Sequence, residues 1–354
     1  MEELRLFTIA DLREWVETGI PKEGLSEAVI PYTRAYSFIH NPYAKEDMPV
    51  VSCLLVDGEV AAYTASFPEK LERPLCTTHW INSLYVSPKY EGKGYGLFVV
   101  GSLMECYEND PVFDLDAVDT SVEILNYLGL SSRSIVQYVF RNKMIQRNSL
   151  RGHLAYGLNQ FKRQMTTKRT LARLRKTIKE ANYWLGYDNF LDKEAYEFMV
   201  SHSEKDVFLR SRETINWMIR YPFVNEAPLK HRIKKRSAFP ASKRWQRYYV
   251  VKVFHQIKII GVYILCDSES KLSLSYFYCE PEYHETVLLS VAEHILKLGN
   301  QRFSTTNADV AYFIKKSRIY DISAQADVSF CYPIEYEGIV NLQVQNGDGD
   351  MFLN

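Results

Sequence analysis

The first 150 residues alternate between strand-like and helix-like patterns of apolar and polar positions. Alternating or β-branched apolar runs predict strands, and apolar residues at helical spacing predict amphipathic helices. Asp57-Gly58 separates two apolar runs and predicts a tight hairpin turn. The predicted strands are Arg5–Ile9, Val50–Leu55, Val60–Phe67, Thr78–Val86, Val112–Val118 and Ile135–Phe140, and the predicted helices are Leu12–Thr18 (with Asp11 as N-cap), Ser26–Ile39, Leu97–Tyr107 and Ser121–Leu128. This order predicts a fold of the α/β (α+β) class.

A similar pattern returns in the second half of the chain. The run from Ser83 to Glu91 can be laid on the run from Tyr276 to His284, and an apolar helix follows both. We interpret this similarity as an internal repeat, with a chance likeness of two strand–helix units as the alternative. The predicted strands here are Tyr248–Phe254, Ile259–Cys266, Leu272–Cys279, Arg302–Thr305 and Ala326–Tyr332, and the predicted helices are Val287–Leu298 and Ala308–Ile314.

The stretch from Trp80 to Gly96 combines a strand, a glycine-rich turn and the start of a helix. Such a turn directs several backbone N–H groups toward one point at the positive end of a helix, which predicts an anion site for a diphosphate. Glycine permits close approach of a phosphate and positive φ angles. The spacing is not that of a nucleotide triphosphate loop, and without a glycine at Leu97 the dinucleotide fingerprint is incomplete. A glycine turn that binds nothing is the alternative.

This stretch resembles the acetyl-CoA loop of the GNAT N-acetyltransferases. In that family a strand ends in Val-x-Pro and is followed by Arg/Gln-x-x-Gly-x-Gly/Ala. Here Val86-x-Pro88 is followed by Lys89-x-x-Gly92-x-Gly94, so Lys89 replaces the usual Arg or Gln. The order of elements over residues 3–145 also agrees with the family. The resemblance implies a mixed-sheet domain that binds acetyl-CoA as co-substrate, through Leu84, Tyr85, Val86, Lys89, Glu91, Gly92, Lys93, Gly94, Tyr95 and Gly96.

The resemblance also implies direct attack of a primary amine on the thioester carbonyl. Backbone N–H groups near Leu84 and Val86 are expected to stabilise the oxyanion. The catalytic candidates are His79, as general base, and Asn82, which can orient a water or the substrate. A lone strand histidine is more often structural. Glu91 and Glu123 are expected to point to solvent.

The helix that follows is a weaker match. In the family it carries Asn-x-x-Ala-x-x-Leu-Tyr, whose tyrosine can protonate the departing thiolate. Matching Gly129 to the family glycine places Leu125 at the tyrosine position, while Tyr127 faces elsewhere.

The repeat implies a tandem GNAT arrangement with a degenerate second copy. In the second copy Glu285, Val287 and Leu289 take the places of the three loop glycines, which predicts a filled site that repels diphosphate. The predicted domains are a GNAT acetyl-CoA-binding domain (1–150), a basic helical linker (151–185), a degenerate GNAT-like domain (186–335) and a C-terminal tail (336–354). The tail is interpreted as a flexible end, because its Asn346–Asp350 stretch lacks the final glutamate of a calcium loop.

Composition narrows the classes of partner. The formal net charge of the 354 residues is zero, which disfavours nucleic acid as a partner. The sequence contains no run of 18 apolar residues, so no membrane-spanning helix is predicted. Six scattered cysteines show no metal-ligand spacing, and the N-terminus lacks a signal core. These features predict a reduced, cytoplasmic protein without a metal. Two basic stretches, Arg151–Lys179 and Lys230–Arg244, favour either solubility or an anion surface.

The function predicted from the sequence is therefore acetyl transfer to a primary amine of a small molecule or peptide. Two alternatives remain open. One is a Fem-type aminoacyl transferase, which also pairs two GNAT folds and uses aminoacyl-tRNA. The other is a protein that binds acyl-CoA without turnover. The identity of the acceptor and the oligomeric state are not encoded in any motif of this chain.

Overall fold

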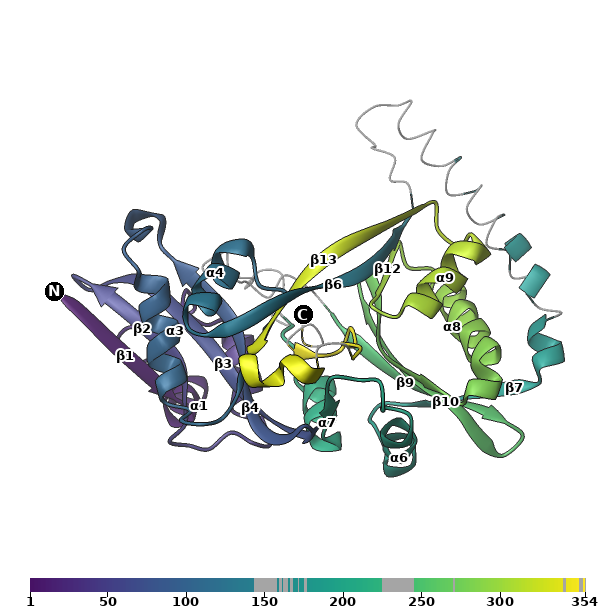
Figure 1. The fold of residues 1–354 in the computed structure, drawn as a ribbon, viewed down its shortest axis with the longest axis horizontal. Coiled ribbons are helices and arrows are strands. Elements are labelled where there is room, and N and C mark those ends of the chain that lie inside the picture. The colour runs from purple at the N-terminus through teal and green to yellow at the C-terminus, as the bar shows by residue number, and fades with distance from the viewer. Residues whose placement is uncertain are drawn as a thin grey trace. The chain divides into compact units, whose positions relative to one another are not determined.

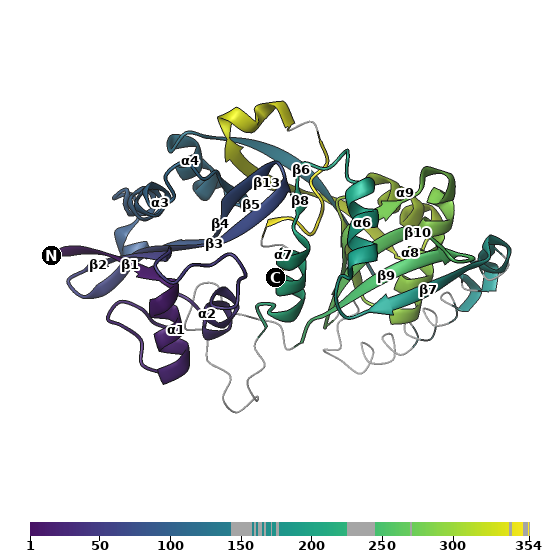
Figure 2. The ribbon, with the colours of Figure 1, turned by 90° about the horizontal axis from the view of Figure 1, so that it is seen from below.

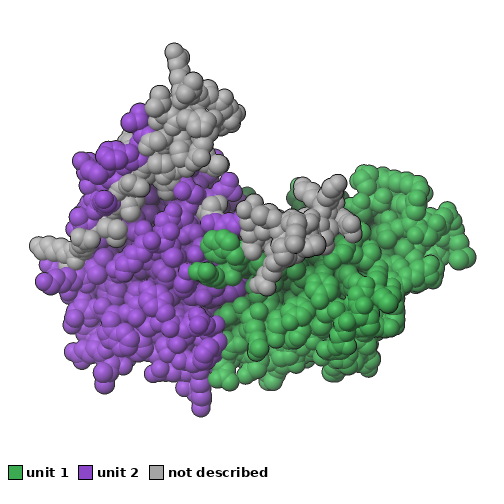
Figure 3. Space-filling model, turned by 180° about the vertical axis from the view of Figure 1, so that it is seen from behind, with its two compact units in different colours: residues 1–135, 205–247, 327–354 green, residues 136–204, 248–326 purple. Residues whose placement is uncertain are grey.

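The computed structural model describes residues 1–142, 177–224, 245–269, 271–339, 342–349 and 353, with scattered positions between 158 and 174. The basic stretch Lys230–Arg244 and about half of the predicted linker 151–185 lie outside the described residues. The chain forms two compact units, each assembled from segments distant in sequence (Figure 3). Unit 1 comprises residues 1–135, 205–247 and 327–354, and unit 2 comprises residues 136–204 and 248–326.

The sheet of unit 1 is mixed. Its strands are β1 (Glu2–Thr8), β2 (Pro49–Val56), β3 (Glu59–Arg73), β4 (Leu75–Val86), β5 (Val112–Leu115), the short β8 (Leu209–Arg210) and β13 (Ile322–Pro333), which starts in unit 2. They lie in the order β1-β2-β3-β4-β5-β13, with β8 paired to β3; β1 to β4 and β13 are labelled in Figure 1, and β5 and β8 in Figure 2. Neighbours from β1 to β4 are antiparallel, β4 and β5 are parallel, and β13 is antiparallel to β5.

Helices cover both faces of this sheet. They are α1 (Ile9–Thr18), α2 (Tyr32–Phe38), α3 (Tyr95–Glu105), α4 (Asp119–Tyr127) and α7 (Arg212–Arg220). Helix α3 lies on one face, and α1 and α2 lie on the other (Figure 2). Val99, Val100 and Leu103 of α3 share a buried core with Ala62 and Ile81 of the sheet. The apolar run after the glycine turn is therefore a helix because one of its faces is removed from water.

Two helices of unit 1 start at positions other than those predicted. Thr8 is the N-cap of α1, since its hydroxyl accepts from the Asp11 N–H at 3.3 Å and the Asp11 carboxylate accepts from the Thr8 N–H at 2.8 Å. The prediction of Asp11 as N-cap is therefore wrong. A helix over Ser26–Ile39 is also wrong, because Pro31 disfavours helical backbone at the residue before it and α2 begins only at Tyr32.

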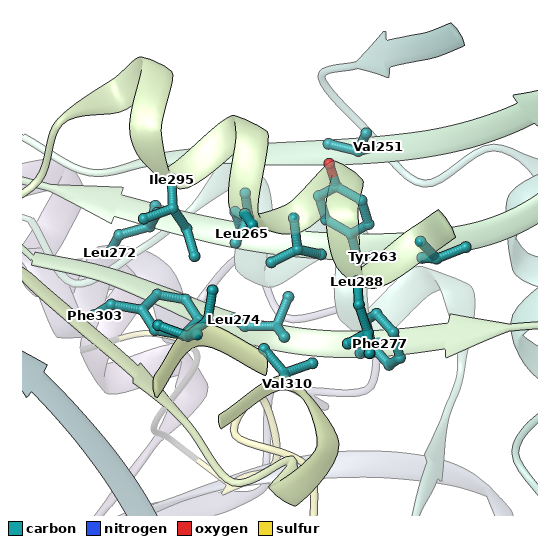
Figure 4. Packing of buried hydrophobic residues seen from close by; sticks show 14 of the residues in the cluster. Val251, Tyr263, Leu265, Leu272, Leu274, Phe277, Leu288, Ile295, Phe303 and Val310 are labelled. Atoms are coloured by element: carbon teal, nitrogen blue, oxygen red, sulfur yellow. The ribbon is translucent and has the colours of Figure 1, made fainter. Parts of the chain in front are cut away.

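Unit 2 has its own set of strands and its own core. Its strands are β6 (Leu130–Arg141, starting in unit 1), β7 (Tyr183–Asp188), β9 (Arg247–His255), β10 (Lys258–Ser268), β11 (Lys271–Cys279) and β12 (Arg302–Thr305), in the order β6-β12-β11-β10-β9-β7. Its helices include α6 (Lys193–Ser201), α8 (His284–Leu298) and α9 (Ala308–Ser317). Tyr263, Leu265 and Phe277 of the sheet pack against Ile295 of α8 and Val310 of α9 (Figure 4).

The internal repeat is visible in both units. The series β3, β4, η1 (Pro88–Tyr90) and α3 recurs as β10, β11, η3 (Pro281–Tyr283) and α8. Each series carries an extra residue at the same place in its second strand, Asn82 in β4 and Ser275 in β11. The last strands of the two copies are exchanged: β6 pairs with β12 in unit 2, and β13 pairs with β5 in unit 1. The predicted α/β class and tandem arrangement are confirmed.

The C-terminal segment is part of the folded unit 1. After η4 (Ile334–Ile339), the side chains of Gln345, Asn346 and Asp348 are buried. The Gln345 N–H donates to the Asp348 carboxylate at 2.8 Å, and the Gln345 amide donates to Asp206 at 3.1 Å. The prediction of a flexible end is therefore wrong at these residues. A polar, glycine-rich composition indicated a loose tail, but its polar groups are satisfied inside the protein.

Candidate functional site

The predicted anion loop lies between η1 and α3 in unit 1. Gly92 and Gly94 have φ angles of 75° and 77°, a region that glycine adopts without strain. A Cβ at either position would meet no atom within 4 Å, so the loop is open. Gly94 is the N-cap of α3 and offers no side chain to the first N–H groups of the helix. These groups are therefore suited to an anion.

The third glycine, Gly96, has a different role. A Cβ there would lie 2.8 Å from Ile124 Cδ1 of α4 and 3.1 Å from Val86 Cγ2 at the end of β4. Gly96 is buried, unlike Gly92 and Gly94. It therefore permits α3 to pack closely on α4 and β4. The resemblance grouped Gly96 with the ligand-binding residues, and the structure places it in a packing position beneath the loop.

The other loop side chains surround the loop. Lys89 donates to the Glu59 carboxylate at 2.7 Å, and this hydrogen bond raises the pKa of Lys89. The Lys93 ammonium lies 5.2 Å from the Tyr90 ring centroid. Tyr95 donates its hydroxyl to Glu2, and Glu91 and Glu123 are exposed as expected. Lys93 thus lies beside the open loop, which supports an anionic ligand there, whereas the charge of Lys89 is balanced by Glu59.

Strand β4 diverges from β5 just before this loop. The two strands pair only at His79–Val112 and Trp80–Phe113 among the described residues, whereas β4 pairs with β3 as far as Val86. The Ser87 N–H donates to Ala61 on the β3 side at 2.8 Å. Because successive N–H groups of a strand alternate in direction, those of Val86 and Leu84 point to the opposite, diverged edge. These are the two N–H groups that the resemblance implies for the oxyanion.

Asn82 lies at the bulge of β4. There it contacts Arg34, a residue that the sequence did not identify as a candidate. The Arg34 guanidinium of α2 donates to Asn82 Oδ1 at 2.6 Å and lies 3.4 Å from the Asn82 carbonyl oxygen. Arg34 is 6% exposed and its guanidinium carbon lies 4.9 Å from the Phe223 ring centroid. The sequence signal that could have identified Arg34 is a charged residue on the same buried side of α2 as Ala35 and Phe38. Arg34 thus fixes the amide of Asn82 at the bulge.

His79 lies in the core. It is 1% exposed, its ring stacks on Tyr107 at 3.5 Å between centroids, and burial lowers its pKa to about 3. Its Nε2 lies 3.5 Å from Asp110, a carboxylate whose side chain is 43% exposed. A neutral, enclosed imidazole of this kind is a weak base that an acceptor amine does not reach. These features favour the structural role of His79 over the catalytic one.

The predicted helix register of α4 agrees with the structure. Leu125, at the position of the family tyrosine, is fully buried in the core below α3. Tyr127 is 79% exposed, so it faces away from that core. Unit 1 therefore has an apolar residue where the family has a phenol.

The second copy lacks the loop altogether. Helix α8 begins at His284, directly after η3, so Glu285, Val287 and Leu289 are helical residues. Val287 is fully buried, and a Cβ on Gly261 of β10 would lie 2.6 Å from its methyl group. The expectation of a loop filled by side chains is corrected: the turn is missing and the helix starts earlier. The copy in unit 2 therefore presents no glycine loop.

The described part of the chain has neither a candidate metal cluster nor a helix suited to crossing a membrane. No group of three or more His, Cys, Asp or Glu side chains there could hold a metal ion. No helix there is both long enough and apolar enough to cross a membrane. The six cysteines are free thiols.

Comparison with known proteins identifies the fold. No protein-family model and no curated protein matches the chain. A GCN5-related N-acetyltransferase from Kribbella flavida is similar over 93% of this chain and 70% of its own, with 12% identity and a TM-score of 0.50. One from Anabaena variabilis is similar over 93% and 72%, with 10% identity and a TM-score of 0.50. A glucosamine N-acetyltransferase region of a fungal multi-domain β-N-acetylglucosaminidase is similar over 94% of this chain but 38% of that one, with 10% identity and a TM-score of 0.52.

These likenesses show the fold and nothing finer. The chain has the fold of the GNAT acetyltransferases, and its internal repeat shows that this fold occurs in tandem.

Proposed function

We propose that this protein is an acyl-CoA-dependent N-acyltransferase whose site lies in unit 1. The observation that carries the proposal is the open glycine loop at the start of α3, next to the edge where β4 leaves β5. The loop N–H groups would bind the diphosphate of CoA, with Lys89 and Lys93 nearby. The diverged edge of β4 would bind the pantetheine arm as an added strand partner.

We further propose that the acyl group is acetyl and that the acceptor is a primary amine. The amine attacks the thioester carbonyl, the oxyanion is stabilised by the N–H groups of Leu84 and Val86, and the C–S bond then breaks. Asn82, two residues before Leu84, and its partner Arg34 would orient the acceptor or a water. With His79 enclosed and Leu125 apolar, we assign proton transfer to water rather than to a side chain of β4 or α4. A thiol has a pKa of about 8.5, so CoA can leave as the thiolate near neutral pH.

A screen of amines with acetyl-CoA and longer acyl-CoA thioesters tests this function, with free thiol release as the readout. We expect amine-dependent thiol release and a product heavier by the acyl group. Thiol release with acetyl-CoA exceeding that with longer thioesters would support the acetyl assignment. Absence of release with every pair, although CoA binds, would contradict the enzyme and favour the binding protein.

The non-catalytic alternative is favoured by one observation, the buried Leu125 in place of a tyrosine. Turnover separates it from the enzyme. Dependence of amine modification on aminoacyl-tRNA, with no use of acyl-CoA, would instead support the Fem-type alternative.

A further inference from the structure

The C-terminal segment 342–349 lies against the point where β4 and β5 separate. Gly349 has a φ of 59°, and a Cβ on it would lie 2.9 Å from Leu115 Cβ of β5 and 3.3 Å from the Trp80 ring of β4. Trp80 and Phe113 form the last β4–β5 pair before the strands diverge. The backbone at Gly349 therefore occupies a space that only glycine fits, between one residue of each strand.

A fully buried arginine holds this segment in place. Arg210 of β8 donates to the Gly349 carbonyl at 2.7 Å, and its guanidinium carbon lies 5.5 Å from the Trp80 ring centroid. Its Nε lies 3.0 Å from the Glu69 carboxylate of β3, and both side chains are completely removed from solvent. The Trp80 indole N–H donates to the same carboxylate at 2.5 Å. Arg210 thus joins β3, β4 and the C-terminal segment in one buried network.

The segment carries its own polar anchors. Asp348 is fully buried, as is the nearby Asp206 at 3% exposure, and Gln345 bonds to both carboxylates. Burial raises the pKa of Asp348 to about 8 and that of Glu69 to about 7, while Arg210 opposes both shifts. Buried polar groups of this kind specify one arrangement of the backbone, because any other arrangement leaves them unsatisfied.

We propose that residues 342–349 form a wedge that sets the divergence of β4 from β5, and that Arg210 is the positioning residue that holds the wedge. This inference rests on the proposed function, because the diverged edge is where the acyl-CoA would bind. The wedge acts through Trp80 and Leu115 on the N–H groups of Leu84 and Val86, and it does not itself contact the reacting atoms. The C-terminal segment therefore helps to shape the proposed acyl-CoA site of unit 1.

Gly349→Ala tests the wedge without removing a buried charge. Arg210→Ala would leave Glu69 buried without its cation, which is strongly destabilising. Gly58→Ala is the matched control, since Gly58 also has a positive φ, 79°, and a Cβ on it would meet nothing within 4 Å. We expect hydrogen exchange of the peptides that contain Trp80–Val86 and Val112–Leu115 to be about tenfold faster in Gly349→Ala than in wild type, and unchanged in Gly58→Ala. Unchanged exchange at these peptides in a folded Gly349→Ala protein, or equal changes in both variants, would overturn the wedge.

A second measurement uses CoA. If the wild type binds CoA, we expect Gly349→Ala to weaken binding about tenfold, because the wedge no longer holds the edge of β4 that binds CoA, and Gly58→Ala to leave binding unchanged. Equal affinity in wild type and Gly349→Ala would overturn the inference while leaving the proposed function intact. If the wild type does not bind CoA, the proposed function fails, and the exchange experiment still decides the wedge. If Gly349→Ala does not fold, hydrogen exchange in the wild type tests the wedge instead. We expect CoA to slow exchange in residues 342–349 together with Trp80–Val86. Slower exchange in Trp80–Val86 alone would overturn the wedge.

Discussion

His79 and Asn82 are three residues apart on β4 but face different surroundings. Side chains alternate along a strand, so the two project from opposite faces. His79 stacks on Tyr107, whereas Asn82 accepts from Arg34 across the other face. Which face is enclosed depends on α2 and on Tyr107, neither of which the strand pattern reveals. The environment thus encloses the candidate base, His79, and brings the candidate orienting residue, Asn82, into contact with Arg34.

The first prediction concerns His79→Phe, which keeps an aromatic ring on Tyr107 and removes the titrating group. The pKa of His79 is about 3 in the fold against an ordinary 6.5, so the unfolded chain binds a proton between these values that the folded protein does not. Stability therefore falls as pH falls through this window, by at most about 1.4 kcal/mol per pH unit from this group. Urea unfolding at pH 7 and pH 5 should show a smaller loss for His79→Phe than for wild type.

The same variant tests catalysis. With His79 enclosed, the pH dependence of amine acylation per folded molecule should keep its position in His79→Phe. A loss of the rate with CoA binding and fold intact would show that His79 is the base after all.

The second prediction concerns the Arg34–Asn82 pair. A hydrogen bond from a buried guanidinium contributes about 1.5–3 kcal/mol, so Arg34→Ala, Asn82→Ala and the double variant should show a coupling energy of at least about 1 kcal/mol in unfolding experiments. We also expect both single variants to lower kcat for amine acylation while leaving CoA affinity within a few-fold of wild type. Arg34→Lys, which retains a positively charged donor group, should recover part of kcat. Additive effects of the two substitutions on stability and rate would contradict the pairing.

At the scale of elements, the strand–turn–helix of unit 1 was predictable from local signals alone. The β-branched run, Pro88 and the glycines determine β4, the turn and α3 within a few residues of one another. The α2 start was mispredicted because Pro31 overrode an apolar pattern. Arg34 was missed because its partner, Asn82, is 48 residues away in sequence. Local sequence patterns therefore predict the glycine loop, but they do not predict that Arg34 contacts Asn82 at the bulge.

The third prediction separates ligand binding at the loop from backbone strain. Gly94→Glu places a carboxylate at the proposed diphosphate site and should abolish CoA binding. Gly58→Glu is the matched control, because Gly58 also has a positive φ, 79°, and open space around its Cα. Both variants should lose about 1–2 kcal/mol of stability from the left-handed backbone. Calorimetry should give one CoA per chain for wild type and Gly58→Glu and none for Gly94→Glu; two sites per chain would contradict the loss of the site in the second copy.

At the scale of the whole molecule, the sequence repeat predicted two copies but not how their strands are shared. Each copy ends in a strand, β6 or β13, in which polar and apolar residues are mixed, so its local pattern does not specify the strand that it pairs with. The choice is made by long-range pairs such as Phe330 with Leu115 and Phe303 with Phe140. Patterns with a period of two specify which residues face the core, but they do not specify the partner strand. The exchange of β6 and β13 between the two copies was therefore not predictable from the sequence pattern.

This exchange leads to the last prediction, which concerns the fragment 1–150. Unit 1 takes β13, β8 and α7 from beyond that boundary. In the fragment Glu69 would lose Arg210, and Ser37 would lose the Trp217 indole that donates to its carbonyl at 2.9 Å. Breaking a buried ion pair costs about 3–5 kcal/mol, which is a large part of the stability of an ordinary domain. We therefore expect the fragment to lack a cooperative urea transition and to release no thiol from acetyl-CoA. A fragment that unfolded cooperatively and acylated the same amine at the full rate would instead show that the N-terminal copy carries the whole activity and that the later segments are dispensable.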